Sequence, residues 1–208
     1  LPGKVQNELG QEAGIHFQHE FELGEKFGFS YGLRYDTYRY LGPRIVRQYE
    51  ENKPLSNGSA ISETNYGDGE VIQTYDGLGP RASFRYSLSK ASSIKLGYNK
   101  MYQFIHLISN TATIAPTDVW KLSDNFLEPQ IADQYSLGFY NNFKGNIFET
   151  SIEVYYKDLQ NVVEYKDGAT LIMQNHLETE LIPAEGQAYG VELYVKKNLG
   201  RLTGWVSY

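Results

Sequence analysis

Large apolar residues fall on almost every second position over several stretches of this chain. In IHFQHEFEL, residues 15–23, and in FGFSYGLRY, residues 27–35, apolar and polar side chains alternate on either side of a turn at Gly24. Alternate side chains of a β-strand lie on opposite faces, so this period predicts strands with one apolar and one polar face. The pattern recurs in residues 81–88, 93–102, 135–143, 148–156 and 189–196, and an eighth strand is expected over 201–208.

Short and long connections alternate between the predicted strands. Short turns are expected near residues 23–26, 89–92, 144–146 and 197–200, and long loops near residues 41–79, 103–132 and 159–187. Tight turns on one side and long loops on the other are typical of a transmembrane β-barrel, and strands of about ten residues cross the bilayer when tilted. The sequence therefore predicts an all-β fold: an antiparallel transmembrane β-barrel, represented by about eight strands in four hairpins.

Two other architectures share this pattern. A soluble β-sandwich binding module has the same period, with its apolar face against a second sheet. A small porin-like or adhesive barrel could close with eight strands, with Tyr208 as its terminal aromatic residue. Against the small barrel, the first strand runs into a short turn and the eighth leaves one, which places both ends of the chain on the extracellular side. We therefore expect four consecutive hairpins of a larger barrel, forming one partial barrel domain over residues 1–208.

Composition narrows the class of partner. The 208 residues carry a formal net charge of −6, include 18 Tyr and 10 Phe, and contain no Cys. The acidic balance argues against a nucleic-acid partner, which requires basic residues to meet phosphates. The absence of Cys excludes disulfide frameworks and thiolate metal sites.

No segment carries a motif of enzyme chemistry. The sequence lacks a nucleophile elbow, a phosphate-binding loop and a Ser/His/Asp set at family spacing, so we expect no enzyme activity, no catalytic residue and no cofactor. His16 and His19 are three residues apart on a strand and therefore point to opposite faces. His106 and His176 are isolated in long loops, so no metal site is expected. The acidic residues of the second loop region are expected to be solvated; they are Asp118, Asp124, Glu128 and Asp133.

Aromatic residues in the long loops are the ligand-binding candidates. Tyr66 and Tyr75 lie in the first long loop, and Trp120 lies in the second. Functional residues concentrate in loops, and aromatic rings there can stack on a ligand. The alternative is that these rings pack the long loops against one another.

Four segments in order resemble the later barrel strands of TonB-dependent outer-membrane receptors. They are GPRASFRYSLSKASSIKLGYNKMYQ, FLEPQIADQYSLGF, IEVYYKDLQNVV and AEGQAYGVELYVKK, followed by GRLTGWVSY, and together they cover most of residues 79–208. Residues 1–40 fit as an earlier hairpin but carry little signature. The chain departs from the family pattern at Gln130, where the family commonly has Glu.

The resemblance implies a role in nutrient import. Such receptors are typically 22-stranded barrels with a plugged lumen, and this chain resembles the C-terminal part of the barrel, with the plug domain and the closing strand absent. The implied function is part of an active transporter in the bacterial outer membrane, which binds a scarce nutrient outside and imports it with energy supplied by TonB. The implied partners are outer-membrane lipid, the plug domain, TonB and a nutrient of the siderophore, cobalamin or glycan class.

Overall fold

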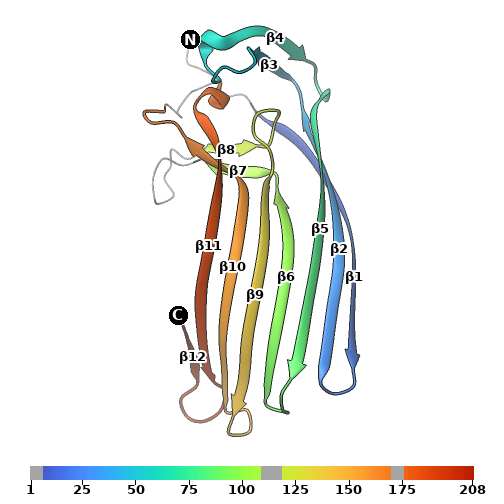
Figure 1. Ribbon diagram of the computed structural model, residues 1–208, viewed down its shortest axis with the longest axis vertical. Helices are drawn as coiled ribbons and strands as arrows, with labels where there is room; N and C mark the ends of the chain where they lie inside the picture. Colours follow the sequence, from blue (N-terminus) through green and yellow to red (C-terminus); the bar gives the residue numbers. More distant parts are fainter. Residues whose placement is uncertain (1–6, 109–118, 170–175) are drawn as a thin grey trace.

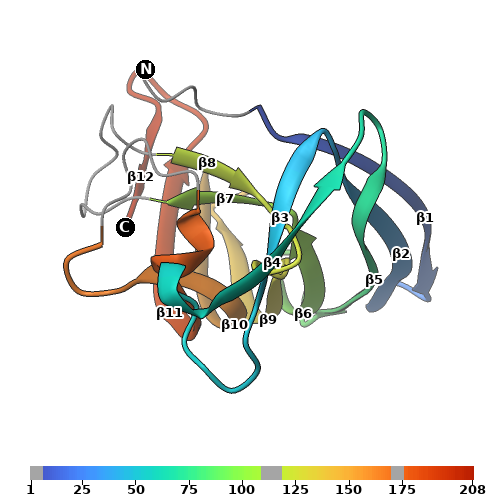
Figure 2. The ribbon, with the colours of Figure 1, turned by 90° about the horizontal axis from the view of Figure 1, so that it is seen from above.

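Eight strands pair side by side in one antiparallel sheet in the computed structural model, which describes residues 7–108, 119–169 and 176–208 (Figure 1). The strands, in their order across the sheet, are β1 (Leu9–Leu23), β2 (Phe27–Leu41), β5 (Val71–Ser87), β6 (Ser92–Gln103), β9 (Gln130–Phe143), β10 (Phe148–Tyr165), β11 (Leu181–Lys197) and β12 (Gly204–Ser207). The predicted all-β arrangement of four hairpins is confirmed. The strands form one curved sheet and not two packed layers, so the β-sandwich alternative is wrong (Figure 2).

Two smaller hairpins lie at the end of the sheet opposite the short turns (Figure 1). One consists of β3 (Arg44–Tyr49) and β4 (Ala60–Tyr66), and the other of β7 (Ile105–Ile108) and β8 (Val119–Leu122). Seen from above, β7 and β8 lie on the concave side of the sheet (Figure 2). Single 3₁₀ turns occur at Asn57–Ser59 and Leu177–Thr179. Within the described ranges, no helix has the length and apolar content needed to cross a bilayer.

Several strands continue into segments where the sequence predicts loop. β5 begins at Val71, although the predicted loop extends to residue 79. Likewise, β10 continues to Tyr165 and β11 already begins at Leu181, although the loop between them was predicted over residues 159–187. The reason is that backbone pairing does not require apolar alternation. The β2–β5 ladder, for example, runs on to the pair Leu41 and Val71, past the end of the apolar band.

The outer face of the sheet carries a continuous apolar band crossed by a row of tyrosines. One register row crosses seven strands; its members are His19, Tyr31, Ala82, Tyr98, Tyr135, Tyr156 and Tyr189. The apolar residues beside this row are exposed, with Leu137 at 45% and Val191 at 54%. Aromatic girdles flank the lipid-facing band of outer-membrane barrels, and this face has that composition.

The buried core lies at the long-loop end, on the concave face. Tyr38 and Tyr40 of β2 are almost fully buried together with Phe104, which follows β6. The rings of Tyr38 and Phe104 stack with centroids 4.8 Å apart. The polar face of the strands therefore becomes an aromatic core only where the β7–β8 hairpin covers it.

Arginine at Leu137 tests the assignment of the outer face. Leu137 lies between Tyr135 and Phe139 on the apolar face, whereas its neighbour Ser136 lies on the concave face. We expect Leu137→Arg in the full-length protein to lower the free energy of unfolding by about 2–4 kcal/mol, because a cation near the bilayer midplane loses its hydration. Urea unfolding in lipid vesicles measures this, with Ser136→Arg as the matched control. Equal losses for the two variants would contradict a lipid-facing Leu137.

Candidate functional site

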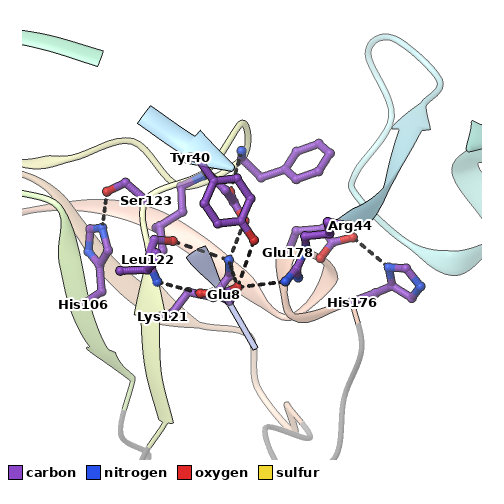
Figure 3. Close-up of polar contacts among 12 residues, drawn as sticks. Glu8, Tyr40, Arg44, His106, Lys121, Leu122, Ser123, His176 and Glu178 are labelled. Carbon is purple, nitrogen blue, oxygen red and sulfur yellow. Dashed lines mark hydrogen bonds and ion pairs between the residues drawn. The ribbon is translucent and has the colours of Figure 1, made fainter. Parts of the chain in front are cut away.

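The β7–β8 hairpin is held against the concave wall by one carboxylate. Glu8 precedes β1, and its Oε1 accepts hydrogen bonds from Lys121 Nζ at 2.7 Å, Arg44 Nη1 at 3.0 Å and the Tyr40 hydroxyl at 3.2 Å (Figure 3). Its Oε2 accepts a bond from the Leu122 backbone N–H at 2.8 Å. A single side chain at the top of β1 thus joins the sheet wall, the start of β3 and the inward-folded hairpin.

Lys121 is the buried cation of this network. It is 2% exposed, forms ion pairs with both Glu8 and Asp124, and lies 5.5 Å from the centre of the Tyr40 ring. Asp124 is 3% exposed, and its Oδ1 also accepts the backbone N–H groups of Phe126 and Leu127. The expectation that this acidic residue is solvated is therefore wrong. A buried charge requires a partner and hydrogen bonds, and both are present here.

His106 supports the hairpin from the strand beside Lys121. It is fully buried, and its Nε2 lies 2.8 Å from the Ser123 hydroxyl (Figure 3). Burial is the main cause that lowers the pKa of His106, to about 4, and the nearby Lys121 ammonium acts in the same direction. The imidazole is consequently neutral at neutral pH, which suits a site that already holds a buried cation.

A second group of contacts joins the three long connections above the sheet. Tyr49 of β3 donates its hydroxyl to Glu178 Oε1 at 2.8 Å, and His176 Nδ1 lies 3.0 Å from the same oxygen. Burial is the main cause that raises the pKa of Tyr49, and the hydrogen bond to Glu178 acts in the same direction. The Tyr49 ring also meets Phe126 edge-on at 5.5 Å, so residues of all three connections converge at this point.

The three predicted ligand-binding residues have different surroundings. Tyr75 lies in β5, packs against the Tyr38 cluster and donates its hydroxyl to the Asp124 carbonyl at 2.6 Å. Tyr66 ends β4 and is partly buried. Trp120 is 62% exposed in β8. Because successive strand residues point to opposite sides and Lys121 points to the wall at Glu8, Trp120 points away from that wall.

Sequence reasoning did not identify Glu8, Arg44 or Lys121. Their partners are distant in the chain, with Glu8 and Lys121 separated by 113 positions, and no local spacing marks them. The sequence offers only one indirect signal, which is a lone Lys between apolar residues in VWKL. In the described parts of the chain, no three His, Asp or Glu side chains are grouped so that they could hold a metal ion.

Comparison with known proteins identifies the family. The family model described as TonB dependent receptor-like, beta-barrel, matches residues 4–208. A comparison with curated protein sequences finds no match.

Solved receptors share the fold at low sequence identity. The FrpB iron transporter of Neisseria meningitidis aligns with a TM-score of 0.58 and 15% identity over 98% of this chain and 26% of its own. The alcaligin receptor FauA of Bordetella pertussis gives 0.54 and 15% over 96% and 30%. The hemophore receptor HasR of Serratia marcescens, in complex with HasA and heme, gives 0.60 and 12% over 91% and 32%.

This chain thus spans about a quarter to a third of the length of each of these receptors. The family match over nearly all residues, the single antiparallel sheet and the apolar outer face agree with one another. The chain belongs to the TonB-dependent receptor β-barrel family and is a bacterial outer-membrane protein.

Proposed function

We propose that this chain is part of an active importer that binds a scarce nutrient at the cell surface and passes it inward with energy supplied through TonB. The family is one of outer-membrane receptors and transporters and not a class of enzymes. We infer that the chain carries out no covalent chemistry. Its tasks are to span the lipid, to enclose a plug domain within the barrel and to shape a ligand site with its long connections.

The observation that carries this proposal is the fixed position of the β7–β8 hairpin on the concave side. The Glu8 network anchors the buried side of the hairpin, while Trp120 remains 62% exposed on its other side. An exposed indole on a rigid support can stack on a ligand at a low cost in conformational entropy. Trp120 is therefore the best-placed candidate to touch a nutrient, and Tyr66 is the second. Tyr75 serves the site indirectly, through its bond to Asp124.

The nutrient belongs to the siderophore, cobalamin or glycan class in this proposal. Cells that express the full-length receptor should take up one labelled representative of these classes, and uptake should cease when TonB is deleted. Uptake that persists without TonB would indicate passive, porin-like diffusion and would contradict the proposal.

Removing the exposed aromatic ring should weaken nutrient binding. We expect Trp120→Ala to lower the affinity of the full-length receptor for its nutrient about tenfold, which corresponds to ~1.4 kcal/mol. Tyr66→Ala should have a smaller effect in the same direction. Equilibrium binding to purified receptor measures both. Tyr189→Ala, an exposed tyrosine on the outer face, is the matched control and should leave affinity unchanged.

Removing the buried cation should release the hairpin. Lys121→Met leaves the Glu8 and Asp124 carboxylates without their shared partner, which typically costs about 3–5 kcal/mol. Amide hydrogen exchange in residues 105–108 and 119–122 should therefore accelerate strongly, the Leu122 amide included, because its acceptor is Glu8. Trp120→Ala should leave these exchange rates unchanged. Similar rates in Lys121→Met and the wild type would show that the network does not anchor the hairpin.

Hairpin protection should also depend on pH. The pKa of His106 in the folded state is about 4, below the usual value near 6.5, so the folded state binds fewer protons than the opened state between these values. Stability of the hairpin should therefore be fully present above pH ~6.5 and should fall as the pH drops toward 4. His106→Gln retains a partner for Ser123 without titrating in this range. Its exchange rates should vary less with pH than those of the wild type; an unchanged pH profile would exclude His106 as the source.

A further inference from the structure

The tyrosine row on the outer face is interrupted on β5. Ala82 lies directly between Tyr31 of β2 and Tyr98 of β6 in the register, so a methyl group stands where the row has rings on both sides. The missing ring leaves a hollow of about 520 Å³ in the lipid-facing surface. Apart from Ala82, the side chains that line it on the outer face include Phe21, Phe29, Tyr31, Phe84, Leu96 and Tyr98.

The polar groups beside the hollow belong to the other face of the sheet. Ser30, Ser83 and Ser136 also border it, but each is next to an outer-face residue in its own strand. Successive strand residues point to opposite faces, so these three hydroxyls point to the concave side. The surface that the hollow presents to the lipid is therefore aromatic and aliphatic.

Contacts between neighbouring rings fix the walls of the hollow. On one side, the ring centres of Phe29 and Phe84 lie 5.1 Å apart. On the other side, the Tyr98 ring centre lies 5.1 Å from that of Tyr135, and the Tyr98 hydroxyl donates to Asp133 Oδ1 at 2.6 Å. A wall ring could turn into the hollow only by giving up such contacts, so the hollow is a built feature of this face.

A row of charged residues marks the depth of the hollow in the membrane. Lys100, Asp133 and Asp158 are opposite one another on β6, β9 and β10, one outer-face position beyond the tyrosine row toward the long connections. Charged side chains are costly at the bilayer centre and far less so near the interface. The long connections of such barrels are extracellular. The hollow between Ala82 and Tyr135 therefore lies just inside the hydrocarbon region of the outer leaflet.

The hollow is continuous with the lipid-facing band, which limits its occupant to something that comes from the membrane. Lipid tails are as apolar as the lining, so a chain gains nothing there from the hydrophobic effect. It gains dispersion contacts instead, because rings touch it on both sides as well as from behind. The lipid of the outer leaflet is lipopolysaccharide, whose saturated acyl chains begin at the level of the charged row. We propose that one acyl chain of a lipopolysaccharide molecule occupies the hollow at Ala82 and holds that lipid at a fixed position on β5 and β6.

Titration of the purified full-length receptor with lipid A, the acylated part of lipopolysaccharide, tests the site by native mass spectrometry in detergent. The wild type should bind one lipid A molecule more tightly than any further ones. Ala82→Tyr completes the row, and it should lower the affinity for this first molecule about tenfold because its ring takes the place of the chain. Val191→Tyr adds a ring at an exposed outer-face position outside the hollow and should bind lipid A like the wild type. Heat-shift electrophoresis shows that both variant barrels are folded.

Photolabelling of the wild-type receptor locates the chain without any substitution. A lipid A analogue with a diazirine in one acyl chain loses dinitrogen under ultraviolet light, and the resulting carbene inserts into a neighbouring C–H bond. Mass spectrometry of the digest should find the label concentrated in residues 81–98, which contain the β5 and β6 walls of the hollow.

Three results would overturn the proposal. Equal affinity of the wild type and Ala82→Tyr for the first lipid A molecule would show that the hollow does not bind it. Label spread evenly over all outer strands would show ordinary contact with the surrounding lipid. A receptor dimer in the native spectra that Ala82→Tyr abolishes would show that a second copy of the chain, and not a lipid, covers the hollow.

Discussion

The bilayer obliges every backbone N–H and C=O group within it to find a partner in the protein. In this chain the partners are neighbouring strands, paired in sequence order across the sheet. That pairing leaves each strand with one face toward lipid and one toward the interior. The side chains are distributed between these two faces by polarity. The apolar residues and the tyrosine row gather on the outer face, and arginines, glutamates and glycines on the concave one. The positions of the long connections, and of anything they bind, follow from this division.

At the long-loop end of the sheet, the position of the β7–β8 hairpin depends on a different interaction. This interaction is the set of buried ion pairs formed by Glu8, Lys121 and Asp124. Such pairs contribute little net stability compared with apolar packing, but breaking one is costly. They therefore act mainly to specify one position for the hairpin. The apolar contact of Tyr38 with Phe104 provides burial, and the carboxylate of Glu8 determines where along the wall β8 comes to rest.

The strands were predictable because their signal is local. A period of two in residues 15–23 or 135–143 requires only neighbouring residues, and the turns between them are short. The anchoring network was not predictable, because Lys121 and Glu8 are far apart in the chain and each looks like an ordinary solvated residue. Asp124 shows the same limit: in the sequence it is one acidic loop residue among several, and only the fold surrounds it with two backbone N–H groups and an ammonium. Tyr75 and Trp120 were both expected in long loops, whereas Tyr75 lies in β5 and Trp120 in β8. Which of the two rings packs and which remains exposed depends on the strand that carries it, and local spacing in the sequence does not show this.

The attachment of the hairpin to Glu8 limits how this receptor can change during evolution. Surface loops usually tolerate insertion and exchange because few contacts cross their boundaries. Here Lys121, in the connection between β6 and β9, forms an ion pair with Glu8, which precedes β1. Glu8 also forms an ion pair with Arg44 at the start of β3. A graft of residues 104–129 alone into a related barrel would carry Lys121 and Asp124 but would place them against a wall that lacks Glu8. New ligand specificities are therefore expected to arise by exchange of the whole set of connections, or by changes confined to the exposed side of β8.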